Sequence, residues 1–259
     1  MRKLRTAALG LALGLSVPGL NTAHAIITRH DLPDEYYVVT DDKFPALVDL
    51  LKRGDCMGTL IHESYLLTVA HCAAELPKGK TLQIKGISNT VDKVILHPGW
   101  EKDSDGDPAK FDIALVHLKQ PVKDVKPVPI YKKTDELGAT VFLIGRGVHA
   151  TGLVGEKGGK DDGKLRRASN RVAAVNQHSL TLIFRRPDDP GVMGTEGVGA
   201  AGDSGCPVFI VQNGVAYLAG LNSGGEDDGP IDIGKYGAKD YQTRVSQYLK
   251  WINDILSSK

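Results

Sequence analysis

Short apolar runs separated by turn-forming residues dominate the chain from residue 26 onward. Runs rich in β-branched and aromatic residues, with Gly, Pro, Asn and Asp between them at intervals of roughly eight to twelve residues, are typical of β-strands. The runs with this character are 36–39, 46–51, 58–61, 65–69, 81–84, 90–96, 113–118, 140–144, 171–175, 180–184, 208–211 and 215–219. We therefore expect an all-β protein.

Two kinds of local signal refine this picture. Asn213-Gly214 separates the last two apolar runs and is a strong signal for a two-residue hairpin turn. At the C-terminus the spacing of apolar residues changes to that of one helix face, with Thr243 or Ser246 available as an N-cap. The apolar residues with this spacing are Val245, Leu249, Trp251, Ile252 and Leu256. The pattern predicts one amphipathic α-helix that closes the chain.

Residues 1–25 have the pattern of a signal peptide. Basic residues at 2–5 precede an apolar run at 7–20, and Ala23-His24-Ala25 matches a small-x-small cleavage site. The run is shorter than the roughly 20 apolar residues that span a bilayer, although a retained anchor is the alternative. We expect a mature domain, residues 26–259, that is secreted or periplasmic and free of the membrane after cleavage.

The composition limits which partners the chain can bind and how many disulfides can stabilise it. The chain has 259 residues, 41% of them hydrophobic, which is enough for a sizeable core. Its 32 basic and 31 acidic residues give a net charge of +1, which favours neither nucleic acid nor an anionic membrane. Three cysteines allow at most one bridge within the chain and lack the spacing of a metal site.

The strongest chemical signal is a serine between two glycines, Gly202-Asp203-Ser204-Gly205. Glycines let the backbone bend tightly enough to present one hydroxyl and to aim nearby N–H groups at one point. A serine hydroxyl is inert at neutral pH, so a nucleophile needs a base and an orienting carboxylate. His71 and Asp112, which precedes an apolar run, are the candidates for these two roles.

These motifs resemble the trypsin/chymotrypsin-like serine proteases. Ala-His-Cys at 70–72, Asp-Ile-Ala-Leu at 112–115 and Gly-Asp-Ser-Gly at 202–205 stand in the family's order, and the likeness extends to 143–147 and 241–245. It covers nearly the whole mature chain and points to a secreted member of bacterial type. The resemblance implies two six-stranded antiparallel β-barrels with the active site between them.

The resemblance also implies an activity. It makes the protein a serine endopeptidase that acts through an acyl-enzyme, with a catalytic triad of His71, Asp112 and Ser204 and an oxyanion hole formed by the N–H groups of Gly202 and Ser204. The partners are then peptide or protein substrates and protein protease inhibitors. The chain is expected to act as a monomer, and the chemistry requires no metal or cofactor.

Substrate preference is the least specific part of the resemblance. Val198 matches the base of the primary pocket, which would make its floor apolar, and Ser223, Gly224 and Gly225 match the segment that pairs with the substrate backbone. We expect an uncharged aliphatic or aromatic side chain before the scissile bond. Asp240 matches a position near the pocket wall and could instead favour a basic side chain.

The resemblance further implies how the site is switched on. In the family a new aliphatic N-terminus folds inward, and its ammonium pairs with the aspartate before the nucleophile, here Asp203. The first basic residue after the leader is Arg29, and cleavage there would expose His30, which fits an apolar socket poorly. Removal of the leader after Ala25 would leave Ile26 as the terminus, so we expect export itself to activate the enzyme.

The resemblance also implies that two of the three cysteines form a disulfide and that the third remains single. Cys56 and Cys72 match the family's bridge beside the catalytic histidine, and a loop of this size contributes about 3 kcal/mol of stability in the chain-entropy model. Cys206 stands where the family usually has glycine. We expect it to be a small buried side chain and not a reactive thiol.

Several alternatives compete with this interpretation. The main one is a catalytically silent protease-like protein used for binding or adhesion, which the intact triad argues against. An esterase of another fold would need Gly-x-Ser-x-Gly and the order Ser, Asp, His. Glycine-rich 152–163 lacks the ending of a phosphate-binding loop and is expected to be an exposed loop. Asp103–Asp107 resembles a calcium loop but lacks the closing glutamate.

Overall fold

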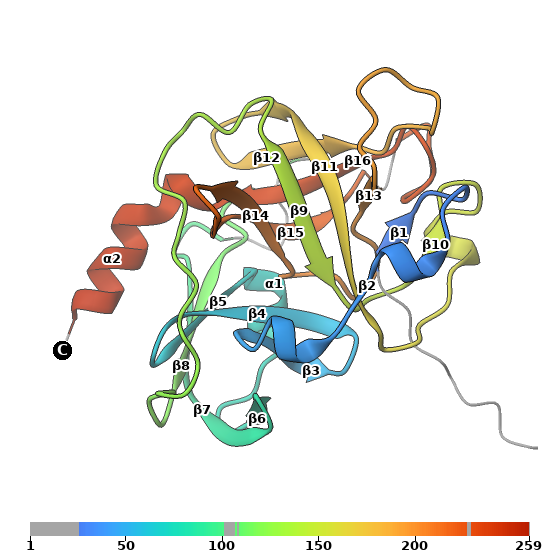
Figure 1. Ribbon diagram of the computed structural model, residues 1–259. Coiled ribbons are helices and arrows are strands. Elements are labelled where there is room, and N and C mark those ends of the chain that lie inside the picture. The colour runs from blue at the N-terminus through green and yellow to red at the C-terminus, as the bar shows by residue number, and fades with distance from the viewer. Residues whose placement is uncertain (1–25, 101–106, 108, 227–228, 259) are drawn as a thin grey trace, which may run out of the picture.

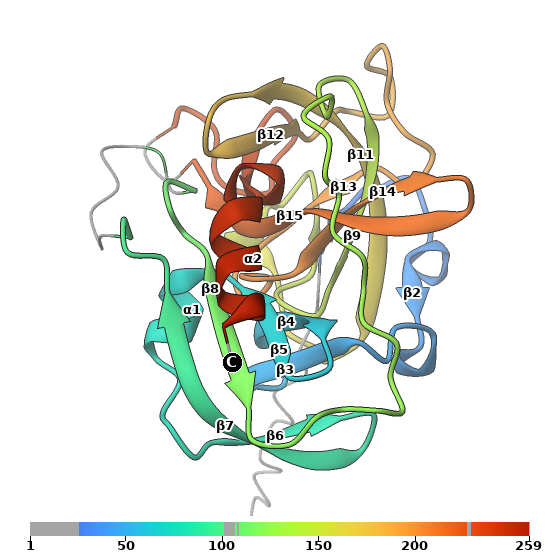
Figure 2. The same ribbon diagram turned by 90° about the vertical axis from the view of Figure 1, so that its left-hand side faces the viewer.

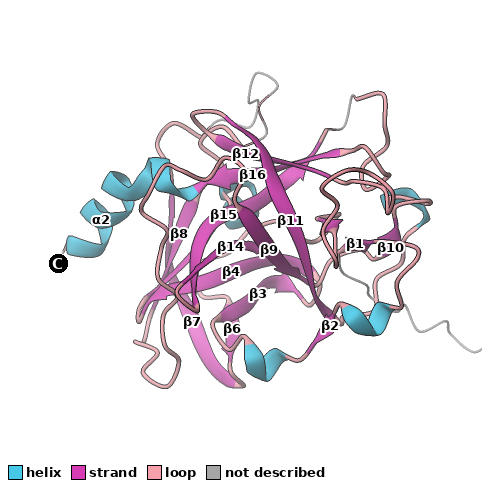
Figure 3. Ribbon diagram, turned by 45° about the horizontal axis from the view of Figure 1, so that its top comes forward, coloured by secondary structure: helices cyan, strands magenta, loops and turns pink. Residues whose placement is uncertain are grey.

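A computed structural model describes residues 26–100, 107, 109–226 and 229–258 (Figure 1). Most of the regular structure in these residues is β-strand, as Figure 3 shows by colour, and the expectation of an all-β protein is confirmed. The strands form two barrels, one drawn below the other in Figure 1, with a C-terminal helix beside them. Together these features are the two six-stranded barrels and helix that the resemblance implied.

The first barrel is a six-stranded antiparallel sheet with the order β3-β4-β5-β8-β7-β6. Its strands are β3 (Leu47–Lys52), β4 (Asp55–His62), β5 (Tyr65–Thr68), β6 (Thr81–Ile84), β7 (Ile87–Leu96) and β8 (Ala114–Leu118). Strand β6 alternates exposed and buried residues, as expected where one face lines the core and the other meets water. Strands β3 and β6 are not paired to each other, so this barrel is nearly closed.

The second barrel closes completely because β11 also pairs with β12. Its order is β12-β16-β15-β14-β9-β11, and β2 (Val38–Val39) extends it beside β11. The barrel strands are β9 (Thr140–Gly145), β11 (Leu165–Val175), β12 (Ser179–Ile183), β14 (Pro207–Gln212), β15 (Val215–Gly225) and β16 (Lys239–Arg244). The β14–β15 turn has left-handed φ values at Asn213 and Gly214, which confirms the predicted hairpin.

A third, three-stranded sheet attaches the start of the described chain to the second half of the molecule. Strand β1 (Ile27–Thr28) lies between β10 (Ala150–Thr151) and β13 (Gly197–Val198), as the right-hand side of Figure 1 shows. The pairing is parallel to β10 and antiparallel to β13. These two-residue strands were not expected from the sequence, and they place Ile26 next to the serine turn.

The predicted C-terminal helix is present as a 3-10 turn, η4 (Val245–Tyr248), followed by α2 (Leu249–Ser257) (Figure 2). Its apolar face packs through Val245, Tyr248 and Ile252 on a core cluster that includes residues of both barrels. The expected caps are wrong, because neither hydroxyl bonds the helix backbone. Thr243 lies in β16 and donates to the carbonyl oxygen of Asp112, whereas Ser246 donates to Glu136.

Other features expected from the sequence lie in loops or outside the described residues. The glycine-rich segment 152–163 is a loop with one 3-10 turn, η3 (Glu156–Gly158), as expected. Residues 1–25 and 103–106 lie outside the described part of the chain. Asp107 is described, and its carboxylate accepts hydrogen bonds from Ala109 and Asn176. Within the described residues, no helix has the length and apolar character needed to cross a bilayer.

Candidate active site

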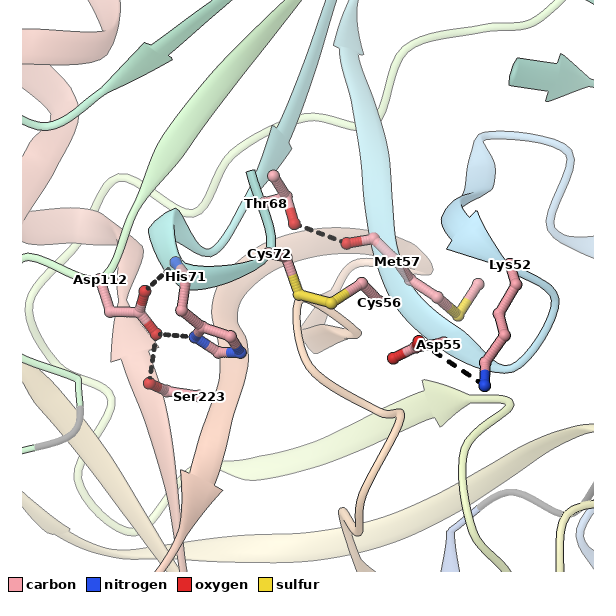
Figure 4. Close-up of a disulfide and its surroundings, with 9 residues drawn as sticks. All are labelled: Lys52, Asp55, Cys56, Met57, Thr68, His71, Cys72, Asp112 and Ser223. Atoms are coloured by element: carbon pink, nitrogen blue, oxygen red, sulfur yellow. Dashed lines mark hydrogen bonds and ion pairs between the residues drawn. A yellow bond between two sulfur atoms is a disulfide. The ribbon is translucent and has the colours of Figure 1, made fainter. Parts of the chain in front are cut away.

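The first barrel brings His71 and Asp112 together at one end of two paired strands. His71 lies in the short helix α1 (Ala70–Ala74), which begins two residues after β5 ends, and Asp112 lies two residues before β8 begins. Strand β5 pairs with β8 through Thr68 and Ala114, so the residues beyond those ends are neighbours. The backbone N–H of His71 donates to Oδ1 of Asp112 across 2.9 Å, and Nδ1 of its ring lies 2.8 Å from Oδ2 (Figure 4).

Two hydroxyl groups of the second barrel hold Asp112 in this orientation. The Ser223 hydroxyl donates to Oδ2 across 2.6 Å, and the Thr243 hydroxyl donates to the Asp112 carbonyl oxygen across 2.8 Å. The side chain of Asp112 is 3% exposed, whereas that of His71 is 40% exposed. Sequence reasoning placed Ser223 in the substrate pocket and missed its contact with Asp112, because the contact joins β15 to the loop before β8.

The pairing with Asp112 governs the proton affinity of His71. Burial lowers the pKa of the ring, but the hydrogen bond to Asp112 and the negative charge of its carboxylate raise the pKa by more, with a smaller contribution from Glu75. The net effect is a pKa above the ordinary histidine value of 6.5. Since the Asp112 carboxylate accepts at Nδ1, the neutral ring carries its proton there and leaves Nε2 free to accept one.

The turn that carries Ser204 depends on its two glycines. Gly202 and Gly205 have φ values of +88° and +76°, in the left-handed region that favours glycine. A Cβ on Gly202 would lie 2.3 Å from the carbonyl oxygen of Gly54, and a Cβ on Gly205 would lie 2.1 Å from that of Met57. No larger residue could occupy either position without moving the backbone.

Backbone hydrogen bonds dock this turn onto strand β4 of the first barrel. The N–H of Cys56 donates to the carbonyl of Gly202, and the N–H of Met57 donates to that of Ser204. The N–H of Gly205 donates to the carbonyl of Asn222, the residue before Ser223. The turn is therefore held between the strand that carries Cys56 and the strand whose Ser223 bonds Asp112.

The N–H groups of Gly202 and Ser204 differ from their neighbours. Those of Ala200, Ala201 and Asp203 donate to acceptors nearby, as do those of Gly205 and Cys206. Within the part of the chain that the structure describes, no hydrogen bond occupies the N–H of Gly202 or Ser204. In the same residues, the Ser204 hydroxyl makes no hydrogen bond with His71.

The expected disulfide lies beside His71 (Figure 4). Cys56 and Cys72 are bonded across 16 residues of sequence, which ties α1 to the strand that contacts the serine turn. Both sulfurs and a ligand atom of His71 lie within 4.8 Å of one another, but sulfurs in a disulfide are not the thiolates that bind metals. Cys206 is buried and unbonded to another sulfur, as expected.

Asp203 is a fully buried carboxylate that accepts three backbone hydrogen bonds. The donors are the N–H groups of Ile26, Gly147 and Ala200, at 3.1, 2.7 and 3.1 Å. Burial raises the pKa of Asp203 to about 6, and the hydrogen bonds act in the opposite direction. The structure thus brings together Ile26 and Asp203, the two residues of the predicted activation pair.

Among the residues assigned to the primary pocket, Val198, Ser223 and Asp240 are buried, whereas Gly225 is half-buried. Val198 packs with Ile27, Phe184 and Tyr236. The carboxylate of Asp240 accepts hydrogen bonds from the N–H of Gly199 and the side-chain amide of Asn222, each at 2.8 Å. Burial raises the pKa of Asp240 to about 7.

Asn222 is a residue of this region that the sequence did not indicate. A Cβ on Gly199 would lie 2.4 Å from the Asn222 amide nitrogen, so the amide rests directly against the Gly199 backbone. A Cβ on Gly225 would lie 2.9 Å from the Ile233 side chain, whereas a Cβ on Gly224 would have open space around it. The surroundings of Asp240 are therefore polar, although the floor residue Val198 is apolar.

Comparison with known proteins shows the family and agrees with the fold. The family model described as Trypsin matches residues 37–252. Vitamin K-dependent protein C of Mus musculus is 28% identical over 233 residues, which are 82% of this chain and 48% of that protein. CLIP domain-containing serine protease B4 of Anopheles gambiae is 24% identical over 249 residues, 82% of this chain and 67% of that protein.

A solved structure, that of neuropsin, a serine protease expressed in the limbic system of mouse brain, superposes with a TM-score of 0.64. It has 18% sequence identity and covers 85% of this chain and 98% of neuropsin, so it supports the fold alone. The chain spans about half the length of the protein C relatives that it matches. These relatives are animal proteins, and they give no support to the expected bacterial type.

Proposed function

Because the chain belongs to the trypsin family, we propose that it is a serine endopeptidase that uses Ser204, His71 and Asp112. The observation that carries this proposal is the paired hydrogen bonding of His71, whose backbone N–H and ring Nδ1 both meet the Asp112 carboxylate. A histidine held by a buried carboxylate at Nδ1 presents Nε2 as a base. The serine turn is docked on the same strand that the disulfide links to the helix of His71.

The proposed reaction begins when the Ser204 oxygen attacks the substrate carbonyl and its proton passes to Nε2 of His71. Asp112 stabilises the resulting imidazolium, and His71 then gives the proton to the leaving amine as the peptide bond breaks. In the second half of the reaction, His71 takes a proton from water as the water attacks the acyl group, and then gives that proton to the Ser204 oxygen as the acyl group leaves. Hydrogen bonds between a nucleophile and its base often form only once substrate is bound, so their absence from the free enzyme is compatible with this mechanism.

The N–H groups of Gly202 and Ser204 would stabilise the oxyanion of the tetrahedral intermediate. Their neighbours in the turn donate to protein acceptors, whereas within the described residues these two do not. Loss of one such donor typically costs about 3–4 kcal/mol of transition-state stabilisation. Gly202 is required in this role because any Cβ would meet Gly54.

The proposal includes export and maturation at one bond. Residues 1–25 would direct the chain to the periplasm or the exterior, and their removal would turn the Ile26 N–H into an ammonium. That N–H already donates to Asp203. Ile26 also has a φ of +60°, a rare and strained value for a β-branched residue. The angle φ of Ile26 is defined by its peptide bond to residue 25, so cleavage of that bond removes the strain.

The proposed substrates are peptides or proteins with an uncharged side chain before the scissile bond. The pocket would be formed by Val198, Ser223, Gly225 and Asp240. Burial raises the pKa of Asp240 to about 7, which favours its neutral form at a pH well below that value. Protein protease inhibitors would compete for the same cleft. We propose a monomer that needs no cofactor.

Hydrolysis of casein by the chain that begins at Ile26 tests this function. We expect fragments from the wild type and from Ser88→Ala, a control at an exposed serine, but none from Ser204→Ala. Equal cleavage by wild type and Ser204→Ala would overturn the proposal. A folded wild type that cleaves neither casein nor a peptide library would favour the silent binding protein instead.

A further inference from the structure

Phe111, the residue immediately before Asp112, has a backbone φ of +56°. Few residues other than glycine adopt this left-handed region, and a bulky aromatic residue there is a genuine outlier. Such a conformation persists only where the surroundings enforce it, and it is often found at functional sites. The contacts of Phe111 therefore decide how the chain enters Asp112.

The Phe111 ring contacts two histidine rings. His97 stacks on it with centroids 5.0 Å apart and planes 3° apart, and His178 lies 4.6 Å away at 60°. Gly99 also packs closely on the ring, since a Cβ at that position would lie 3.0 Å from ring atoms of Phe111. Close contacts with these three residues restrict the movement of the ring.

The backbone of Phe111 is fixed separately by Tyr248. The N–H of Phe111 donates to the Tyr248 hydroxyl across 3.1 Å, and the same hydroxyl lies 3.1 Å from Nδ1 of His178. The hydroxyl oxygen accepts from Phe111, and its one hydrogen can be donated to Nδ1 when that nitrogen is unprotonated. Nδ1 of His97 likewise accepts from the N–H of Gly99.

Burial favours the neutral form of both histidines where they contact the ring. Burial lowers the pKa of His97, and His178 lowers it further. Burial also lowers the pKa of His178, with Asp107 acting against it and Lys110 with it. Neutral rings stack on Phe111 without the cost of a buried charge.

This cluster joins parts of the molecule that are distant in sequence. His97 follows β7 of the first barrel, and His178 lies between β11 and β12 of the second. Tyr248 belongs to η4, and Trp251 of α2 lies edge-on to His97 with centroids 5.1 Å apart. Phe111 therefore lies where both barrels meet the C-terminal helix.

The chain turns sharply at the next residue. The N–H of Ile113 donates to the carbonyl of Phe111 across 2.8 Å, which closes a three-residue turn centred on Asp112. The direction of the Asp112 side chain consequently depends on the dihedral angles of Phe111. The carboxylate then reaches both the backbone and the ring of His71.

We propose that Phe111 is a positioning residue, whose ring, held by its contacts with His97 and His178, sets the direction from which Asp112 binds His71. The inference rests on the proposed function, in which Asp112 orients the catalytic base. Phe111 acts through Asp112 and has no part in the bond-breaking steps. A smaller side chain at 111 would leave the turn free to relax and the carboxylate free to move.

The test compares Phe111→Gly, which can adopt φ of +56° but has no ring, with Phe111→Tyr, which keeps the ring. The first readout is the NMR resonance of the His71 Nδ1 proton, assigned by its loss in His71→Ala. The second is peptide hydrolysis. For Phe111→Gly we expect the resonance to shift or exchange away, and kcat to fall by about 10- to 100-fold with little change in KM. Phe111→Tyr should retain both.

An unchanged resonance and unchanged kcat in a folded Phe111→Gly variant would overturn the proposal. If that variant does not fold, His178→Ala takes its place, since it removes one of the two rings that contact Phe111 and leaves Phe111 itself unchanged. The same loss of the His71 resonance is then expected, and an unaltered resonance would contradict the proposal. The resonance needs no activity, so a wild type that fails to hydrolyse peptides would refute the proposed function while leaving this inference testable.

Discussion

The backbone N–H of Ile26 donates a hydrogen bond to Oδ2 of Asp203 across 3.1 Å, although 177 positions separate the two residues in sequence. Ile26 follows the predicted cleavage site, and Asp203 precedes the proposed nucleophile. Asp203 is fully buried, and burial raises its pKa to about 6. An ammonium at Ile26 would stabilise the carboxylate in its charged form far better than a neutral N–H.

The first prediction is that the active exported form begins at Ile26. Two extra residues before Ile26 would leave a neutral amide at this position, and breaking a buried ion pair costs about 3–5 kcal/mol. We therefore expect such a chain to lose at least about 100-fold in kcat/KM. N-terminal sequencing of the active form and peptide hydrolysis by the extended chain measure this. A different terminus, or full activity in Asp203→Asn, would contradict it.

The second prediction concerns the triad as one unit. Ser204→Ala and His71→Ala should each lower kcat by about 10⁴- to 10⁶-fold, and the double variant should be scarcely worse, because the residues act in the same step. The kcat values of the three variants on one peptide substrate test this. Losses that add in free energy would indicate that the two residues act independently.

The third prediction is the pH dependence of hydrolysis. Because the proposed base must be neutral and its pKa is raised above 6.5, kcat/KM should rise with pH through a midpoint above 6.5. Asp112→Asn removes the charge that raises the pKa, so the midpoint should move down while activity falls by about 10⁴-fold. A midpoint that stays in place in Asp112→Asn would show that another group titrates.

The fourth prediction links substrate preference to Asp240. Peptides with Leu, Val, Ala or Phe before the scissile bond should be preferred over those with Arg at pH 6, where Asp240 is protonated. The relative rate for Arg should rise as pH passes about 7 and the carboxylate ionises. Asp240→Asn should remove that rise. A library profile at pH 6 that is dominated by Arg or Lys would refute the prediction.

The sequence predicted the fold best where a residue type strongly favours one local structure. β-Branched runs identified most barrel strands, and Asn213-Gly214 identified a turn. Strand β16 (Lys239–Arg244) was missed because its Lys-Asp-Tyr-Gln-Thr-Arg sequence is polar. Four of its polar residues, Asp240, Gln242, Thr243 and Arg244, are buried nonetheless. Asp240 and Thr243, for example, bond to residues outside the strand.

The contacts that orient the site were less accessible to sequence reasoning. Ser223 was expected in the pocket, but its hydroxyl also donates to Asp112, and Asn222 was not expected to contact Asp240. These contacts join residues 111 and 18 positions apart, so no local pattern encodes them. They depend on the register between β15, β16 and the loop before β8.

The most direct test of the central claim is the mass of the chain after incubation with a fluorophosphonate, followed by peptide mapping. The proposed mechanism predicts one adduct, on Ser204, in the folded chain that begins at Ile26. It predicts none in Ser204→Ala and much slower labelling in His71→Ala, where no base accepts the proton. A folded wild type without an adduct, or equal labelling of Ser204→Ala, would contradict the assignment of this chain as a serine endopeptidase.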